Sequence, residues 1–224
     1  TTTSMLAWIL ECAGLAPGFS QAHYAILIWP ATALAVLSQA VFAVEYRKRY
    51  RVEQQLKQLS DTDPLSGVGN RRYFMRALDQ ESARANRLAQ PLSLLSLDID
   101  RFKRINDELG HLAGDRALRH VVETLDQQME DGDWLARLGG EEFALLLPLP
   151  VGRAWERLEA MRRTVASQPF VPEHGADPMR LTFSAGIACW PQDGADLSQL
   201  LRKADLRLRH AKLEGRNRVL ARDP

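Results

Sequence analysis

The stretch Leu92-Ser-Leu-Leu-Ser-Leu-Asp-Ile-Asp100 decides the fold. It is apolar apart from its serines until it ends in aspartates, and this pattern predicts a central strand of an α/β sheet. Carboxylates at such a strand end lie where α/β proteins place active sites, and their oxygen atoms suit Mg²⁺. Asp98 and Asp100 would point to the same face if the strand continued, whereas a following turn would separate them.

Downstream of this strand, Gly139-Gly140-Glu141-Glu142 lies between apolar runs that begin at Trp134 and Phe143. The pattern predicts a β-hairpin, whose glycines supply the positive φ of the tip and let a ligand approach the backbone. Adjacent acids at a tight turn repel each other. They are tolerated in solvent and favoured by a divalent cation, so the turn is either a solvated hairpin or part of a cation site.

A predicted helix that starts near Asp196 carries Lys212 and Arg216 close to its end, where Gly215 interrupts it. Their spacing puts both cations on one side of a helix. Two such cations could clamp a triphosphate, or they could complement the negative end of the helix dipole.

The remaining pattern predicts a central sheet of about five strands flanked by helices. The expected helices lie near 70–88, 113–129, 153–166 and 196–213. The expected strands lie near 92–98, 134–138, 142–148, 180–189 and 217–221. His111 is expected in a loop before the second helix.

The N-terminal part differs from the rest. Residues 24–44 contain no charged side chain, and the basic run Arg47–Arg51 follows them. A largely apolar run of this length is typical of a transmembrane helix, and the basic run places its C-terminal side in the cytoplasm. The alternative is a buried helix of a soluble domain. We expect three parts, which are a membrane segment over 1–46 with its span near 24–44, a connector helix over 47–62, and a domain over 63–224.

Composition narrows the possible function classes. The chain has 224 residues and a formal net charge of +1, which gives no global electrostatic case for a nucleic-acid partner. Its 46% apolar and 25% charged residues exclude a disordered chain. Two cysteines, Cys12 and Cys189, cannot make a disulfide framework.

Six segments between Asp63 and Val219 form a series with a recognisable order and spacing. They are Asp63-Pro-Leu-Ser-Gly-Val-Gly-Asn-Arg-Arg72, Leu97-Asp-Ile-Asp-Arg-Phe-Lys-Arg-Ile-Asn-Asp107, Gly110-His-Leu-Ala-Gly-Asp115, Arg137-Leu-Gly-Gly-Glu-Glu-Phe143, Thr182-Phe-Ser-Ala-Gly-Ile-Ala188 and Ala211-Lys-Leu-Glu-Gly-Arg-Asn-Arg218. Together they resemble the GGDEF-domain diguanylate cyclases, in the Gly-Gly-Glu-Glu-Phe version that active enzymes use. The resemblance implies an α/β fold like that of nucleotidyl cyclases and the polymerase palm.

The resemblance also implies a metal site and catalytic residues. Asp98, the Ile99 carbonyl and Glu141 would hold Mg²⁺ or Mn²⁺ on the phosphates of GTP, with Glu142 a further candidate ligand. Removal of the 3′-hydroxyl proton needs a base. Glu141 is a candidate for it, but a metal-bound carboxylate is a poor base, so that role stays open. Lys103 would neutralise phosphate charge.

The implied substrate contacts involve three further groups of residues. Asn106 and Asp115 would bind the guanine edge, to which an amide and a carboxylate are suited. The terminal phosphates would be held by Lys212 and Arg216. The remaining implied contacts come from Phe102, beside the phosphates, and from Gly139 and Gly140, which admit the nucleotide.

The implied reaction joins two GTP into cyclic di-GMP and two pyrophosphates. Two domains would face each other, so that each 3′-hydroxyl attacks the α-phosphate of the opposite GTP. The implied assembly is a homodimer through the catalytic domain and the connector helix. Together with the predicted span, it would lie at the bacterial inner membrane with the domain in the cytoplasm. The alternative is a degenerate domain that binds GTP as a regulatory module.

Some positions depart from the family pattern. Product-inhibited members carry Arg-x-x-Asp before the hairpin, but here Glu130 replaces the arginine while Asp133 is retained. Because a carboxylate would repel a cyclic di-GMP phosphate, we expect the inhibitory site to be absent. Ser66 stands where the family has threonine, and Arg209 where it often has tyrosine.

Overall fold

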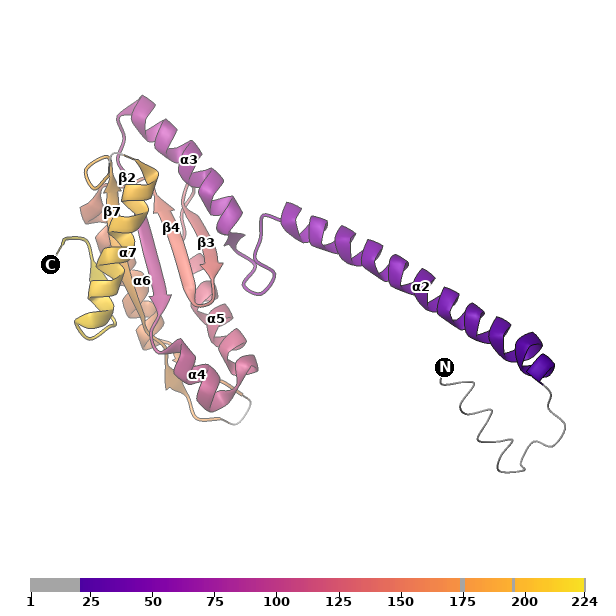
Figure 1. Ribbon diagram of the computed structural model, residues 1–224. Helices are drawn as coiled ribbons and strands as arrows, with labels where there is room; N and C mark the ends of the chain where they lie inside the picture. The colour runs from indigo at the N-terminus through magenta and orange to yellow at the C-terminus, as the bar shows by residue number, and fades with distance from the viewer. Residues whose placement is uncertain (1–20, 174–175, 195, 224) are drawn as a thin grey trace. The chain divides into compact units, whose positions relative to one another are not determined.

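The computed structural model describes residues 21–173, 176–194 and 196–223, and in its first helix the side chains of Pro30 and residues 32–50. Two compact units divide between Leu59 and Ser60. The first contains helix α2, which runs without interruption over Gln21–Leu59 (Figure 1). The expected connector helix over 47–62 is thus continuous with the helix before it and ends at Leu59.

The predicted membrane span over 24–44 is not confirmed. Among the described residues, no helix is long and apolar enough to cross a membrane. Within α2, the described side chains from Thr32 to Val44 are uncharged, and Glu45 and the basic run follow them. The side chains of residues 24–29 and 31, and the whole of 1–20, lie outside the described residues.

The second unit is built on a mixed six-stranded sheet, one strand more than expected. Its order is β1-β3-β4-β2-β7-β8, with parallel pairs at both edges and antiparallel pairs between them. The strands are β1 (Gly69–Asn70), β2 (Leu92–Ile99), β3 (Trp134–Gly139), β4 (Glu142–Leu147), β7 (Phe183–Trp190) and β8 (Val219–Leu220). A separate hairpin pairs β5 (Pro169–Phe170) with β6 (Met179–Arg180).

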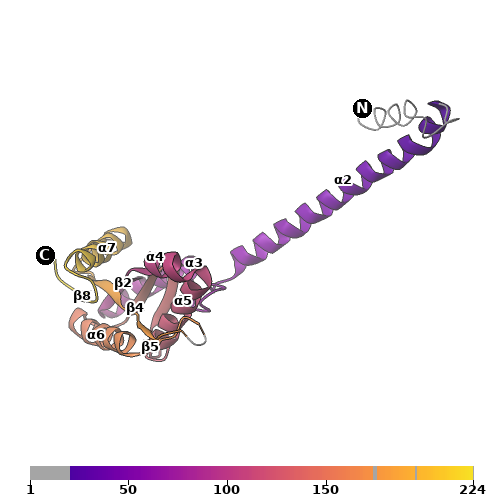
Figure 2. The same ribbon diagram turned by 90° about the horizontal axis from the view of Figure 1, so that it is seen from below.

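Helices cover both faces of this sheet, so that β2 is buried along its whole length. The helices are α3 (Arg71–Leu88), α4 (Phe102–Leu109), α5 (His111–Asp126), α6 (Val151–Ser167) and α7 (Leu197–Leu213). Figure 2 shows α6 and α7 on opposite sides of the sheet. The short helix α4 and strands β1, β5 and β6 are absent from the predicted elements, and His111 opens α5 instead of lying in a loop.

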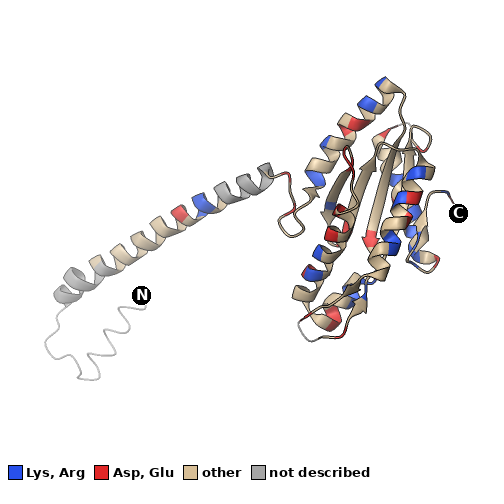
Figure 3. Ribbon diagram, turned by 180° about the vertical axis from the view of Figure 1, so that it is seen from behind, with Lys and Arg blue, Asp and Glu red and all other residues tan. Residues whose placement is uncertain are grey.

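The alternation of β2 divides the core into two layers. Leu95, Leu97 and Ile99 join the core beneath α5 and α6, whereas Leu92 and Leu94 join the core beneath α3 and α7. Asp98 has the same parity as Leu94, so the alternation places it on the α7 face. Figure 3 shows charged residues spread over the helices and loops, while the strands carry few of them.

Close packing of α7 on β7 depends on Gly186. A Cβ at this position would collide with backbone atoms of Ala204 and Leu208 in α7. The absent side chain therefore lets α7 lie close to the sheet, which brings the C-terminal end of this helix to the end of β2.

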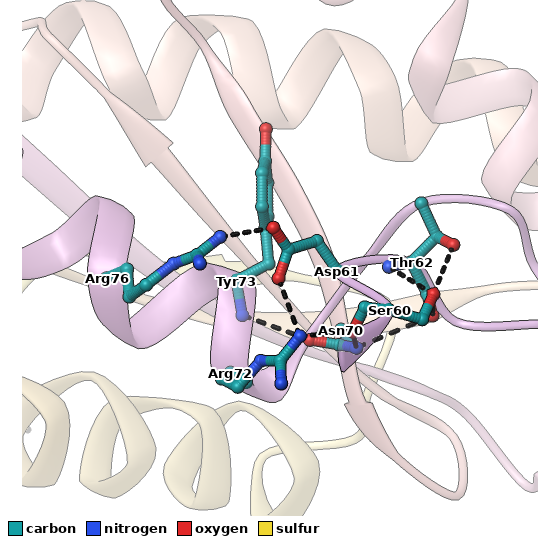
Figure 4. Close-up of polar contacts among 7 residues, drawn as sticks. All are labelled: Ser60, Asp61, Thr62, Asn70, Arg72, Tyr73 and Arg76. Atoms are coloured by element: carbon teal, nitrogen blue, oxygen red, sulfur yellow. Dashed lines mark hydrogen bonds and ion pairs between the residues drawn. The ribbon is translucent and has the colours of Figure 1, made fainter. Parts of the chain in front are cut away.

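A cluster of polar contacts connects the first residues of this unit with the start of α3 (Figure 4). The Asp61 carboxylate forms ion pairs with Arg72, at 3.0 Å, and with Arg76. The Ser60 carbonyl accepts hydrogen bonds from Asn70 Nδ2 at 2.7 Å and from Arg72 Nη2 at 2.8 Å. Hydrogen bonding to Arg76 and Arg72 lowers the pKa of Asp61. Residues 60–61 are thereby attached to the first turns of α3.

Candidate active site

Asp98 lies at the centre of the candidate site, at the end of β2. It is paired across the sheet with Glu142 of β4 and with Ser184 of β7, and its residue is 4% exposed. Lys212 of α7 places Nζ 2.7 Å from Asp98 Oδ2. Burial raises the pKa of Asp98 to about 6, although the hydrogen bond from Lys212 lowers it. The buried carboxylate would therefore be stabilised by a further cation.

The acidic hairpin adjoins this carboxylate. β3 ends at Gly139 and β4 begins at Glu142, and the positive φ of Gly139 (146°) and Gly140 (53°) forms the predicted tip between them. The Ile99 amide donates to the Glu141 carbonyl at 3.3 Å, which joins the tip to the end of β2. The charges of Glu141 and Glu142 also raise the pKa of Asp98. The structure thus brings all four predicted metal-site residues to one sheet edge.

The donors at this edge fit Mg²⁺ or Mn²⁺ better than a softer metal, because they are carboxylate and carbonyl oxygens. Within the described residues, no group of three His, Cys, Asp or Glu side chains could hold a metal ion. Mg²⁺ commonly takes only one or two carboxylates and completes its shell with substrate phosphates and water. The edge therefore suits a metal ion that arrives with a phosphorylated substrate.

Arg137 fixes the carbonyl side of the hairpin tip. Its Nε and Nη2 donate to the Gly140 carbonyl at 3.0 and 2.7 Å, and its Nη1 lies 3.0 Å from Asp63 Oδ1. The same Asp63 oxygen accepts from the Ser66 amide and hydroxyl, at 2.9 and 2.7 Å. Burial raises the pKa of Asp63, but these hydrogen bonds and Arg137 outweigh it and leave the pKa lowered. These contacts form a link from the Gly140 carbonyl through Arg137 to Asp63, and the Ser66 hydroxyl supports it by donating to Asp63.

Neither Arg137 nor Asp63 is among the predicted site residues, although both lie in segments that resemble the family. They are 74 positions apart in the chain. Their opposite charges are the feature of the sequence that could have indicated this pair. No local sequence pattern connects the loop before β1 with the end of β3.

The predicted guanine-binding residues lie on adjoining helices. Asn106 is on α4 and Asp115 is in the first turns of α5, and both are half-buried. A Cβ at Gly114 would collide with the Asn106 side chain, so this glycine lets α4 and α5 approach each other. Phe102 is 5% exposed and belongs to the core, so any substrate contact from it passes through its backbone. Lys103 is exposed on the first turn of α4.

The two predicted phosphate-binding cations do not share a helix. Lys212 belongs to α7, which ends at Leu213, whereas Arg216 follows in a turn. Arg216 has a φ of 67°, and its amide donates to the Ala211 carbonyl at 3.0 Å. The expected arrangement on one helical side is therefore wrong, because α7 ends at Leu213, before Gly215 and Arg216.

β2 ends at Ile99, so that Asp98 lies in the strand and Asp100 in the turn after it, which decides the alternative that the sequence left open. Asp98 pairs with Lys212, whereas Asp100 accepts hydrogen bonds from Thr182, Ser184 and the Asn217 amide. Asp100 is only 8% exposed and is fully engaged by these donors. The two acids therefore do not form one carboxylate pair.

Comparison with known proteins shows matching sequences over most of this unit. The family model described as "Diguanylate cyclase, GGDEF domain" matches residues 60–218. Diguanylate cyclase DgcP of Pseudomonas aeruginosa is 42% identical over 166 residues, covering 73% of this chain and 24% of that protein. Response regulator PleD of Caulobacter vibrioides is 33% identical over 202 residues, covering 84% of this chain and 44% of that protein. The chain thus spans less than half the length of these curated relatives.

Solved structures agree in fold. The GGDEF domain of DgcB from Caulobacter crescentus, solved in complex with c-di-GMP, has a TM-score of 0.69 and 32% identity, covering 72% of this chain and 95% of that one. A second DgcB structure, with coiled coil and GGDEF domain, has a TM-score of 0.70 and 30% identity, covering 85% and 100%. The predicted palm-like α/β fold is confirmed by these similarities.

Proposed function

The chain belongs to the GGDEF-domain family of diguanylate cyclases, and from this premise we propose that it condenses two GTP into cyclic di-GMP and two pyrophosphates. The observation that carries the proposal is the convergence of Asp98, the acidic hairpin tip and Lys212 at one sheet edge. Incubation of the full chain with GTP and Mg²⁺ tests it, with cyclic di-GMP detected by chromatography and mass spectrometry. Intact GTP binding without product would contradict it.

The proposed metal ligands are Asp98, the Ile99 carbonyl and Glu141, with Glu142 as a further ligand. When bound, Mg²⁺ or Mn²⁺ would neutralise phosphate charge and stabilise the charge that develops on the phosphoryl oxygens. Asp98 is held ready for this role by its buried position at the strand end.

The remaining roles bind and orient the substrate. Asn106 and Asp115 bind the guanine edge, and the exposed Lys103 neutralises phosphate charge. Lys212 exchanges its partner Asp98 for the terminal phosphates, so the ion pair keeps this cation in place before GTP arrives. Gly139 and Gly140 leave room at the tip for the nucleotide.

The proposed reaction needs two half-sites, each with one GTP. We propose a homodimer in which the domains face each other, because pairing converts the encounter of two bound nucleotides into an oriented reaction. The location of the chain at the bacterial inner membrane stays a prediction. A degenerate GTP-binding module is not favoured, since matched relatives are named diguanylate cyclases.

The link through Arg137 leads to a prediction on the rate. We expect Arg137→Ala to lower kcat about tenfold, because the Gly140 carbonyl and Asp63 both lose their common donor. Steady-state rates of cyclic di-GMP formation measure the effect. Arg84→Ala is the matched control, because Arg84 is exposed and pairs with Glu81 of the same helix. Equal rates in Arg137→Ala and wild type would contradict the role of the link.

Product inhibition is expected to be weak. The side chain of Asp133 is 2% exposed, and it is occupied by Arg157 Nη2 at 2.6 Å and by the Glu130 amide at 2.8 Å. Glu130 Oε2 also lies 3.4 Å from Arg157 Nη1. The family's inhibitory site would instead need a cation at this position that is free to bind phosphate. We expect calorimetric titration of cyclic di-GMP to give a Kd above about 1 μM. Tighter binding that is lost in Asp133→Asn would contradict this expectation.

A further inference from the structure

The turn after α7 has an unusual backbone. Gly215, Arg216 and Asn217 have φ values of 114°, 67° and 48°, so three consecutive residues are left-handed. Glycine adopts this region freely, but arginine does so at a cost in free energy. Such strain persists where surrounding contacts enforce it, and it is concentrated at functional sites.

Contacts on two sides hold this turn. On one side the Asn217 amide donates to Asp100 Oδ2 at 2.9 Å. On the other side Arg162 Nη1 of α6 donates to Asn217 Oδ1 at 2.5 Å. Asn217 is therefore fixed by both its backbone and its side chain, immediately after Arg216.

Asp100 is itself rigidly placed. Its Oδ1 accepts from the Ser184 hydroxyl and its Oδ2 from the Thr182 hydroxyl, both at 2.7 Å. The Asp100 amide donates to the Thr182 carbonyl at 2.9 Å. A buried carboxylate with this many donors is a fixed acceptor, and it connects the end of β2 with the turn that carries Arg216.

The strained arginine lines an open cavity. The acids Asp100 and Glu108 line a cavity of about 280 Å³, and Glu108 is engaged in an ion pair along its own helix. The cavity is also bordered by Arg216, Arg101 and Arg180. None of these three guanidinium groups forms an ion pair with a described acidic side chain. Because Glu108 is paired and Asp100 is engaged by its hydrogen-bond donors, the three arginines favour an anion in this cavity. The terminal phosphates of the proposed substrate have this chemistry.

We propose that Asp100 is a positioning residue for GTP, which holds the left-handed turn and so presents Arg216 to the terminal phosphates. The inference rests on the proposed function, since it takes GTP as the ligand of Arg216. Without the Asp100 acceptor, the turn relaxes toward ordinary backbone conformations and Arg216 loses its fixed direction. The consequence is weaker substrate binding with the metal ligands still in place.

The central experiment compares KM and kcat for GTP in the full chain. We expect Asp100→Ala to raise KM about tenfold and to change kcat less than about twofold. Asp100→Asn should restore a KM close to wild type, because its amide oxygen can still accept from the Asn217 amide while its NH₂ donates to the Ser184 hydroxyl. Ser184→Ala is the matched control, since it removes a donor to Asp100 and leaves the bond to Asn217.

A double-mutant cycle tests whether Asp100 acts through Arg216. If it does, Asp100→Ala adds no further rise in KM when Arg216 is already alanine, whereas independent effects multiply. Multiplied effects, or a wild-type KM in Asp100→Ala, would overturn the proposal.

A second variant guards against loss of folding. If Asp100→Ala does not fold, Arg162→Met removes the opposite support of the turn without touching β2, and it should raise KM in the same direction. A wild-type KM there would also overturn the proposal. If the wild-type chain makes cyclic di-GMP and these variants have the wild-type KM, the role of Asp100 is refuted and the proposed function stands. If the wild-type chain makes no cyclic di-GMP, the proposed function itself is refuted.

Discussion

Asp98→Asn is expected to lower the rate of cyclic di-GMP formation by about a hundred- to a thousandfold, the range seen when one preorganised charge-stabilising group is lost. Asparagine keeps the shape of the side chain but removes the negative charge on which metal binding at this edge depends. The rate measured at saturating GTP and Mg²⁺ checks the expectation.

Stability should change little in the same variant. Burial raises the pKa of Asp98 to about 6, so the ionised carboxylate is costly in the fold. The substitution would remove this cost together with the ion pair to Lys212, whose side chain is 33% exposed and can be hydrated. We expect a Tm within about 3 °C of wild type. Asp79→Asn, at an exposed position of α3, is the matched control.

The two readouts together make this prediction decisive. Lost activity with an unchanged Tm assigns Asp98 to the chemistry. A variant that keeps its activity would exclude the proposed metal site, and a variant that loses activity and structure together would assign Asp98 to folding.

The largest expected effect on stability comes from Gly186→Ala. The added methyl group would collide with the backbone of α7 at Ala204 and Leu208, and backbone atoms cannot move aside as a flexible side chain can. We expect a loss of about 3 kcal/mol in the free energy of unfolding, measured by urea denaturation.

Gly152→Ala is the control for this substitution. Gly152 lies in the first turn of α6, and a Cβ there would meet no described atom within 4 Å. Alanine should therefore stabilise the helix by up to about 1 kcal/mol. Equal effects of the two substitutions would show that α7 does not depend on close packing at Gly186.

The sequence predicted the elements that carry a long apolar pattern. β2 and the hairpin of β3 and β4 were found because their apolar runs are long and end in distinctive residues. Helix α4 has only eight residues and two buried ones, Phe102 and Ile105, so it shows no repeated period. Strands β1, β5 and β6 have two residues each and leave no pattern to detect.

The site was predictable where residues lie next to each other in the chain. The acidic tip and the end of β2 were identified from local motifs, and pairing of β2 with β4 brings them together. Links between distant segments were not predictable. The contact of Arg162 with Asn217 joins positions 55 apart, and Asp100 meets Asn217 across 117 positions. Local propensity carries no information on such pairs.

The contacts that attach Ser60 and Asp61 to α3 have a consequence for how such chains can evolve. All of these contacts lie within the unit that begins at Ser60, so the beginning of its fold is completed by its own residues. Different N-terminal modules could therefore be joined before Ser60 by gene fusion without rebuilding the core. Recombination at this junction can exchange the N-terminal segment while preserving the fold of the unit that follows it.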